Sequence, residues 1–354
     1  MDTSEKKIVI DYLMVRKERG DQGVHSASLE DIDLVQRYGT ETFEALVCRG
    51  LKRADIVHVC DIHPQFYPKL KRGRVSVAMC HFLPETLDGS IALPKGIMKL
   101  FKSYVMAFYR RADHLVTVNP VYVDQLVKLG FDPKRVHYIP NCVSTETFHP
   151  LSIKEKLRAR HEFNLKNNDF VVLSVGQTQP RKGLYDFIEL AEDNPDVQFI
   201  WAGGFTFGRL TAEHRKIKRA IQKCPPNLHF IGVVERSRMN ELYNACDMYV
   251  SVSYNELFPM TILEAASVGL PILVRDLDLY EPILGRDVLR ATDISEFSAT
   301  IKRMHGADAS LRSSFSLASQ ALAQRYAPEL VYRQWEKLYR EILLDAPRFA
   351  KRRR

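Results

Sequence analysis

The chain has 354 residues, of which 45% are hydrophobic, so it is long enough for two domains with substantial cores. Its formal net charge is +8, and the lack of any run of eighteen apolar residues excludes a membrane-spanning helix.

The N-terminal residues 1–7 have no apolar stretch of the secretory kind, which favours a cytoplasmic protein. Six cysteines are scattered without CxxC spacing or a nearby histidine pair, which indicates free thiols and no structural zinc. These are Cys48, Cys60, Cys80, Cys142, Cys224 and Cys246.

In the first half of the chain, strand signals alternate with helical ones, which predicts a parallel sheet with helices on both faces. The expected strands are 7–13, 56–59, 75–79 and 115–118, and the expected helices are about 40–52, 97–111 and 120–129.

The alternation restarts after Pro150, behind a linker at residues 138–150. The expected strands are 170–175, 198–202, 229–232, 248–252 and 271–274, and the expected helices are about 153–164, 183–193, 211–223, 236–245 and a helix from Thr261. Two successive doubly wound halves are therefore predicted, with the ligand at the carboxyl ends of their strands, in the crevice between them.

An amphipathic helix is expected at residues 328–343, with Trp335 and Tyr339 as packing residues. The predicted division is an N-terminal domain 1–148, a C-terminal domain 149–327, a terminal helix 328–345 and a basic tail 346–354.

The positive charge is concentrated between Arg49 and Arg111, where twelve basic residues face four acidic ones. The rest of the chain is therefore close to neutral. Such a local excess suits an anionic surface, either lipid head groups or nucleic acid, and the alternative is a solvated face.

Two carboxylates, Glu256 and Glu264, stand on either side of the start of an apolar helical run near Thr261. Glu256 precedes the helix, and Glu264 lies one turn after Thr261 on the same face. Free N–H groups at a helix start suit phosphate, whereas carboxylates suit the hydroxyls of ribose and hexose. The arrangement indicates a ligand that carries both, such as a nucleotide sugar.

Glu256 and Glu264, with Leu-Phe-Pro-Met-Thr-Ile-Leu between them, resemble the E-x7-E motif of the retaining glycosyltransferases of family 4. The segment 171–183, which ends in Arg181-Lys182-Gly183, resembles that family's strand and loop for the donor diphosphate. The resemblance implies a GT-B architecture: two Rossmann-like domains facing a central cleft, with the C-terminal helix crossing back onto the first domain.

The segment 81–90, His-Phe-Leu-Pro-Glu-Thr-Leu-Asp-Gly-Ser, resembles more narrowly the bacterial enzymes that glucosylate or galactosylate diacylglycerols. By this resemblance His81 is a catalytic residue near the reacting sugar. The alternative is a structural role, which is the usual one for a lone histidine at a strand end. For Glu85 and Asp88 two roles remain open: they hold the acceptor, or they cap the next helix.

The resemblance also implies the donor ligands. Lys182, with Arg181 beside it, would stabilise the charge of the leaving diphosphate, and both Lys182 and Glu256 are assigned catalytic roles. Glu264 would bind the ribose hydroxyls and Glu256 the donor sugar. Further donor contacts are expected from backbone groups of Phe258, Met260 and Thr261, from Val233 against the base, and from Gly23 in the loop after the first strand.

The sequence departs from the family pattern at two positions. Gln177 stands where many relatives carry an arginine, which removes one expected positive charge. Cys142 replaces a usual hinge glycine.

Apolar and aromatic residues repeat at helical spacing between Ile97 and Phe108, with basic residues beside them. A basic amphipathic helix of this kind lies in the interface of an anionic membrane, and the alternative is packing against its own sheet. The residues assigned to membrane or acceptor contact are Lys95, Lys99, Phe101, Lys102, Tyr104, Phe108, Arg110 and Arg111.

The leading hypothesis is a peripheral enzyme of the inner face of the cell membrane. It would transfer glucose or galactose from a UDP-sugar to diacylglycerol or monoglycosyldiacylglycerol with α retention. We expect no cofactor, no nucleic-acid partner and no metal, since no aspartate pair is identified as a metal site. One alternative is the same fold acting on a soluble or polyprenyl-linked glycan, and a second is a non-catalytic module that binds anionic lipid.

Overall fold

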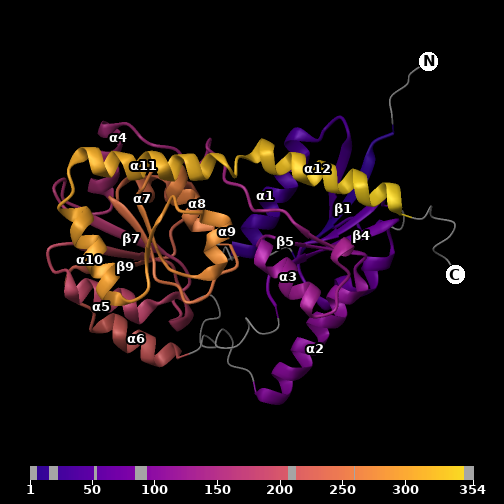
Figure 1. The fold of residues 1–354 in the computed structure, drawn as a ribbon, viewed down its shortest axis with the longest axis horizontal. Coiled ribbons are helices and arrows are strands. Elements are labelled where there is room, and N and C mark those ends of the chain that lie inside the picture. Colours follow the sequence, from indigo (N-terminus) through magenta and orange to yellow (C-terminus); the bar gives the residue numbers. More distant parts are fainter. Residues whose placement is uncertain are drawn as a thin grey trace. The chain divides into compact units, whose positions relative to one another are not determined.

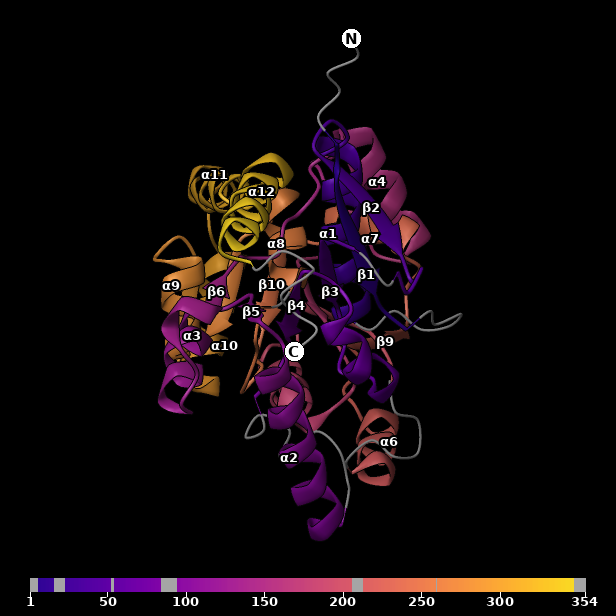
Figure 2. The ribbon, with the colours of Figure 1, turned by 90° about the vertical axis from the view of Figure 1, so that its right-hand side faces the viewer.

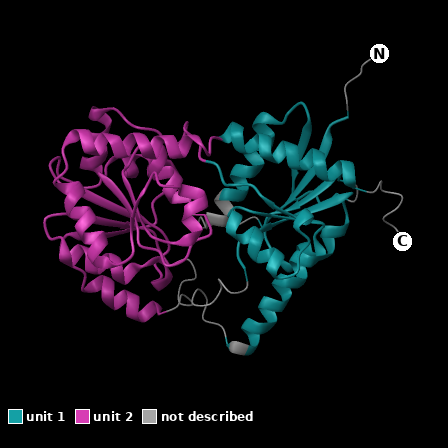
Figure 3. Cartoon of the chain, viewed as in Figure 1, with its two compact units in different colours: residues 1–87, 93–142, 328–354 teal, residues 88–92, 143–327 magenta. Residues whose placement is uncertain are grey.

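The computed structural model describes residues 6–15, 23–51, 54–83, 94–205, 213–258 and 260–346, with the side chains of 23–26 and 95 left aside. The chain forms two compact units (Figure 1, Figure 3). The N-terminal unit comprises 1–87, 93–142 and 328–354, and the C-terminal unit comprises 88–92 and 143–327. In the part of the chain that is described, no helix is both long and apolar enough to cross a bilayer.

The N-terminal unit contains a six-stranded, fully parallel sheet in the order β2-β1-β3-β4-β5-β6. Its strands are β1 (Ile8–Leu13), β2 (Phe43–Val47), β3 (Ile56–Val59), β4 (Val75–Cys80), β5 (His114–Thr117) and β6 (Val136–Tyr138). Its helices are α1 (Gly23–Tyr38), α2 (Lys95–Arg111), α3 (Pro120–Lys128) and α12 (Pro328–Asp345).

The helix predicted at residues 40–52 is wrong: the chain there forms strand β2, which pairs in parallel with β1. Helix α1, which precedes it, was not predicted. Its core-facing side includes the buried polar residues Ser28 and Asp31, which interrupt the apolar stripe that marks a helix in a sequence.

Helix α12 packs on the N-terminal unit through a buried polar network. The Tyr339 hydroxyl lies 2.9 Å from the Tyr12 hydroxyl and 2.7 Å from His58 Nδ1. Trp335 Nε1 donates to Asp31 Oδ1 at 3.2 Å. The last helix of the chain is thus fixed to β1, β3 and α1 by directional bonds as well as by its apolar face.

The C-terminal unit contains a second parallel six-stranded sheet, in the order β12-β11-β10-β7-β8-β9. Its strands are β7 (Val171–Val175), β8 (Gln198–Ala202), β9 (Leu228–Gly232), β10 (Met248–Ser251), β11 (Ile272–Arg275) and β12 (Leu289–Ala291). Its helices are α4 (Ile153–Glu162), α5 (Leu184–Asp193), α6 (His214–Gln222), α7 (Arg236–Asn244), α8 (Met260–Ser267), α9 (Glu281–Leu284), α10 (Ile294–His305) and α11 (Ala309–Gln324).

Aromatic and branched residues of this sheet and of helix α5 form the core of the C-terminal unit. Phe187 from α5 meets Phe199 and Trp201 from β8 edge to face, with ring centroids 5.4 Å apart in both pairs. The core keeps β7, β8 and β10 in place, and the carboxyl ends of these strands carry the loops described below.

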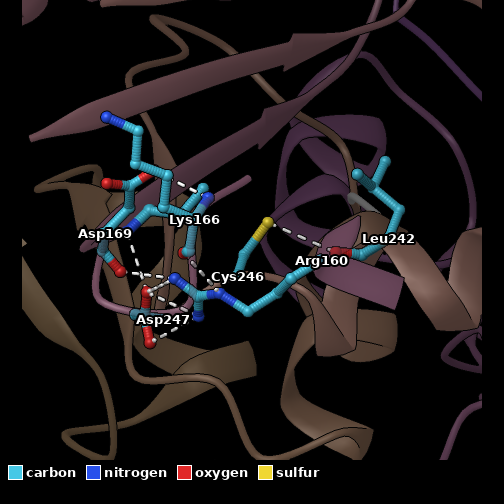
Figure 4. Close-up of polar contacts among 7 residues, drawn as sticks. Arg160, Lys166, Asp169, Leu242, Cys246 and Asp247 are labelled. Atoms are coloured by element: carbon cyan, nitrogen blue, oxygen red, sulfur yellow. Dashed lines mark hydrogen bonds and ion pairs between the residues drawn. The ribbon is translucent and has the colours of Figure 1, made fainter. Parts of the chain in front are cut away.

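At the opposite end of this sheet, Arg160 of α4 is buried against Asp247, which precedes β10 (Figure 4). The same guanidinium donates to the carbonyl oxygens of Lys166 and Asp169. Asp247 also accepts from the Val171 N–H at 2.8 Å. This cluster joins α4 to the amino-terminal ends of β7 and β10 and satisfies every donor group of a buried arginine side chain.

Candidate active site

The order of strands in the C-terminal sheet reverses between β7 and β10, which are neighbours. In parallel α/β sheets, ligands bind outside the carboxyl ends of the strands at such a reversal. The loop after β7 carries Arg181 and Lys182, and the loop after β10 carries Glu256. The fold therefore brings the two motifs singled out in the sequence to one edge of one sheet.

Lys182 and Glu256 form an ion pair across these two loops. The Ser253 hydroxyl donates to the same carboxylate oxygen of Glu256 at 2.6 Å. Arg181 donates to the Asn255 carbonyl oxygen, so both basic residues of the first loop contact the second loop. Both members of the pair have mostly buried side chains.

Burial affects the two members of the pair differently. It lowers the pKa of the Lys182 ammonium, although Glu256 raises it in part. Burial alone would raise the pKa of the Glu256 carboxyl, but Lys182, Arg181 and Ser253 together hold that pKa below its usual value. Glu256 is therefore a carboxylate at neutral pH, held by cations at the strand edge.

Glu264 lies on α8 with an exposed fraction of 2%. One oxygen accepts from the Arg236 guanidinium, and the other accepts from the Tyr243 hydroxyl at 2.7 Å. Arg236 in turn stacks over the Phe148 ring at 5.0 Å. A charge this deeply buried needs such partners, and Glu264 is consequently held in one orientation.

The other residues predicted around the start of α8 lie as follows. Met260 is the first residue of the helix, and the N–H groups of its first turn have no acceptor within the helix. Thr261 Oγ1 lies 2.7 Å from the buried Tyr249 hydroxyl. Phe258 is buried against Tyr326, with centroids 5.4 Å apart. The side chain of Phe258 therefore packs in the core, which leaves its backbone for any contact with a ligand.

Glycines line the carboxyl ends of β7, β8 and β9. A Cβ atom on Gly203 would lie 1.9 Å from the carbonyl oxygen of Gly176, so the two backbones touch. Gly203 N–H donates to the Gly232 carbonyl oxygen at 2.7 Å. The next residue, Val233, is 73% exposed, an unusual position for valine and one that suits a flat apolar ligand surface.

The remaining predicted site residues belong to the N-terminal unit. His81 follows β4, and its Nε2 lies 2.7 Å from the Cys60 carbonyl oxygen. Burial lowers the pKa of its imidazole, which favours the neutral form. Gly23 is the first residue of α1. Glu85 and Asp88 lie outside the described residues.

The predicted membrane residues on α2 divide between its two halves. In the C-terminal half, Phe108 is only 1% exposed, so its assignment to a membrane contact is wrong. The Tyr104 hydroxyl donates to the Ile62 carbonyl oxygen at 2.7 Å, and Arg111 Nε donates to the Tyr67 carbonyl oxygen at 2.9 Å. These contacts hold this half on its own unit. Arg110 is exposed, with its guanidinium 6.0 Å from the Phe131 ring centroid.

The N-terminal half of α2 extends beyond the sheet of its unit (Figure 1, Figure 2). Ile97 and Leu100 there are 55% and 72% exposed. Lys99 is exposed beside them, and Phe101 and Lys102 are half-buried. The side chain of Lys95 is not among those described.

Part of the basic excess of the N-terminal unit is paired within the fold. Lys71 binds Asp113 at 2.7 Å, and Arg74 lies 3.6 Å from Asp55. The positive charge available to an anionic surface is therefore smaller than the sequence count indicates.

Three contacts of the site were not predicted from the sequence. Ser253 bonds Glu256, while Arg236 and Tyr243 hold Glu264. Arg236 and Tyr243 belong to no motif singled out in the sequence, so only the packing of α7 against α8 reveals them.

The expectation of no metal was based on the lack of an Asp-x-Asp pair, and that premise is wrong, because the aspartates at 31/33 and 276/278 have this spacing. Asp31 is buried against Trp335, and Asp276 accepts from Arg290 at 2.8 Å. Among the described residues, no group of three or more histidine, cysteine, aspartate or glutamate side chains is arranged so that it could hold a metal ion.

Comparison with known proteins identifies related families. The family model "Glycosyl transferases group 1" matches residues 155–303, and "Glycosyltransferase Family 4" matches residues 36–147. An alpha-galactosylglucosyldiacylglycerol synthase of Streptococcus pneumoniae is 39% identical over 340 residues, which cover 95% of this chain and 90% of that protein. A processive diacylglycerol alpha-glucosyltransferase of Acholeplasma laidlawii is 26% identical over 71% of this chain and 75% of that protein.

Solved structures agree on the fold. HepE of Anabaena, in complex with UDP-glucose, matches with a TM-score of 0.73 at 15% identity, covering 94% of this chain and 99% of that one. A sucrose-phosphate synthase from Thermosynechococcus elongatus matches with a TM-score of 0.76 at 15% identity, covering 96% of this chain and 100% of that one. The expected pair of Rossmann-like domains is confirmed, and the chain belongs to the family 4 glycosyltransferases with the GT-B fold.

Proposed function

We propose that this protein transfers glucose or galactose from a UDP-sugar to a diacylglycerol-based lipid and retains the α configuration. The acceptor would be diacylglycerol or monoglycosyldiacylglycerol. Similarity to the two lipid glycosyltransferases supports the acceptor class, and the neighbour solved with UDP-glucose supports the donor class.

The observation that carries the proposal is the pairing of Lys182 with Glu256 at the strand reversal, beside the start of α8. This edge presents an ammonium and free helix N–H groups for a diphosphate. It also presents two fixed carboxylates, Glu256 and Glu264, for hydroxyl groups. A nucleotide sugar, which carries a diphosphate together with ribose and hexose hydroxyls, would use both sets of groups.

In the proposed reaction, the bond between the anomeric carbon and the diphosphate oxygen breaks, and the acceptor hydroxyl attacks on the face that the diphosphate leaves. Lys182 and the first N–H groups of α8 stabilise the charge that develops on the leaving UDP. The acceptor proton passes to the departing phosphate oxygen. Glu256 would orient the hexose. Neutral His81 uses its Nε2 proton for the Cys60 carbonyl oxygen, so its Nδ1 would accept a hydrogen bond from a sugar hydroxyl.

The nucleoside would be held at two places. Glu264 would accept hydrogen bonds from the ribose hydroxyls, since its fixed orientation leaves lone pairs for them. The uracil ring would lie against the exposed side chain of Val233.

For a lipid acceptor the enzyme must reach a bilayer, and the N-terminal half of α2 is the proposed contact. Ile97 and Leu100 would insert among the acyl chains, while Lys99 and its basic neighbours would meet anionic head groups. In this proposal the protein would lie on the cytoplasmic face of the cell membrane.

Release of UDP in the presence of anionic vesicles tests the proposal. Vesicles that contain diacylglycerol or monoglucosyldiacylglycerol should support UDP release from UDP-glucose or UDP-galactose, and vesicles with neither lipid should not. Release with a soluble glycan alone, or no release with any lipid acceptor, would contradict it.

A further inference from the structure

We propose that Arg275, a residue outside all of the motifs above, is a positioning residue that keeps the Lys182 loop and the Glu256 loop in register. This inference rests on the proposed function, because it assumes that these two loops hold the donor. Arg275 ends β11, next to β10 in the sheet, and is only 8% exposed.

The Arg275 guanidinium has three acceptors on three different segments. Nε donates to the Val252 carbonyl oxygen at 3.2 Å, at the start of the Glu256 loop. A terminal nitrogen forms an ion pair with Asp186, in the first turn of α5, which directly follows the Lys182 loop. The other terminal nitrogen donates to the Thr292 carbonyl oxygen at 3.2 Å, just after β12. One side chain therefore joins the bases of both donor loops.

The two loops are in close contact above this side chain. The Tyr254 N–H donates to the Arg181 carbonyl oxygen at 3.0 Å. Gly183 approaches the second loop so closely that a Cβ atom on it would lie 2.3 Å from the Val252 carbonyl oxygen. That carbonyl is the one that Arg275 binds. A shift of Val252 would therefore be transmitted to Gly183 and to Lys182 beside it.

The geometry requires arginine rather than just a positive charge. A guanidinium presents five donors in a plane, which here reach three acceptors at once, whereas an ammonium is a point charge. The same plane stacks on the Tyr254 ring, with the guanidinium carbon 4.2 Å from the ring centroid. Tyr254 lies two residues before Glu256, so this stacking also restrains the loop that carries the carboxylate.

A buried arginine with several acceptors could simply stabilise the fold, and the chain offers a matched control for that role. Arg160 is also 8% exposed, binds Asp247, and donates to two carbonyl oxygens (Figure 4). It lies at the amino-terminal ends of β7 and β10, whereas Arg275 lies at the carboxyl end of β11. The two arginines thus have comparable structural roles at opposite ends of one sheet.

The test compares Arg275→Lys with Arg160→Lys in the full chain. Thermal unfolding measures the structural effect of each, calorimetric titration with UDP measures donor-site affinity, and UDP release measures kcat and KM. Both variants should lose thermal stability. Only Arg275→Lys should weaken UDP binding and lower kcat/KM, by about tenfold or more at a temperature where both remain folded.

Two results would overturn the proposal. The first is UDP binding and donor turnover by Arg275→Lys within about twofold of the unsubstituted protein, and the second is an equal loss of affinity in Arg160→Lys and Arg275→Lys. Failure of the proposed function would look different, since the unsubstituted protein itself would then release no UDP with any lipid. Titration with UDP would still decide the role of Arg275 in that case.

Discussion

The ammonium of Lys182 and the carboxylate of Glu256 form a buried ion pair although 74 residues separate them in the chain. The pair exists because β7 and β10 are neighbours at the strand reversal, so that the loops after them meet. Each residue prevents the other from being a lone buried charge. The proposed donor site is therefore assembled in part before any ligand binds, which would reduce the reorganisation needed on binding.

Replacing Lys182 by methionine tests the role of the ammonium. The change removes a charge beside the departing diphosphate, so kcat/KM for the UDP-sugar should fall by about 10²–10³-fold in a UDP-release assay. Lys166→Met, at an exposed lysine of the same unit, should leave it unchanged.

The same substitution also leaves Glu256 as an unpaired buried carboxylate and should lower thermal stability. The double variant Lys182→Met with Glu256→Gln should regain stability without regaining activity. Recovery of turnover in the double variant would show that the ammonium does not take part in the reaction.

Glu264→Gln tests the ribose contact. An amide accepts weaker hydrogen bonds than a carboxylate, so KM for the donor should rise about tenfold while kcat changes less, since ribose is bound alike before and during reaction. Tyr243→Phe keeps the carboxylate and removes one of its donors, so its effect on KM should be smaller. Equal KM values for Glu264→Gln and the unsubstituted protein would argue against a ribose contact.

Gly203→Ala tests the close approach of backbones at the strand ends. The new methyl group would meet the Gly176 carbonyl oxygen, and the backbone of Gly203 has a φ of 142°, which alanine rarely adopts. The melting temperature should fall by about 6 °C or more. Gly306→Ala is the control, because its Cβ would have ordinary contacts and its φ of –80° suits alanine.

Asp31→Asn tests the buried network under α12. Burial raises the pKa of Asp31 to about 7, above its usual value of 3.8. The folded state then binds the proton more tightly than the unfolded state, so stability from this group is present below pH 4 and is lost as pH rises through 7. The variant should melt higher than the unsubstituted protein at pH 8 and almost equally at pH 4.

His58 works in the opposite direction within the same network. Burial lowers the pKa of its imidazole to about 3, so its contribution to stability is lost as pH falls from about 6.5 towards 3. Asp31→Asn removes the opposing effect of Asp31. The melting temperature of this variant should therefore rise as the pH increases from about 3 to about 6.5. A melting temperature with the same pH dependence in both proteins would contradict the assignment.

Leu100→Glu tests the membrane contact of α2. The change puts a negative charge on a 72% exposed leucine and should reduce sedimentation with anionic vesicles and turnover of lipid acceptors. Leu157→Glu, at an exposed leucine of α4 in the other unit, should leave both unchanged. Loss of vesicle binding in both variants would indicate a nonspecific effect of charge.

The sequence pattern predicted most elements of the C-terminal unit because its strands are continuous apolar runs between glycines and helices. It was wrong at 40–52, where apolar residues at 43, 46 and 47 fit a helical face and a short strand equally well. Motif residues were found by type and spacing, whereas Arg236, Tyr243 and Arg275 contribute through packing between distant segments. The spacing on α2 also could not separate its buried half from its exposed half.

Analysis of the lipid product is the decisive measurement for the proposed hexose transfer. The protein would be incubated with UDP-glucose or UDP-galactose and anionic vesicles of diacylglycerol or monoglucosyldiacylglycerol, and the lipids examined by mass spectrometry and by the anomeric proton signal in NMR. We expect a lipid heavier by one hexose with an α linkage, and far less of it from Lys182→Met under the same conditions. A β linkage, or hexose transfer only to soluble glycans, would contradict it.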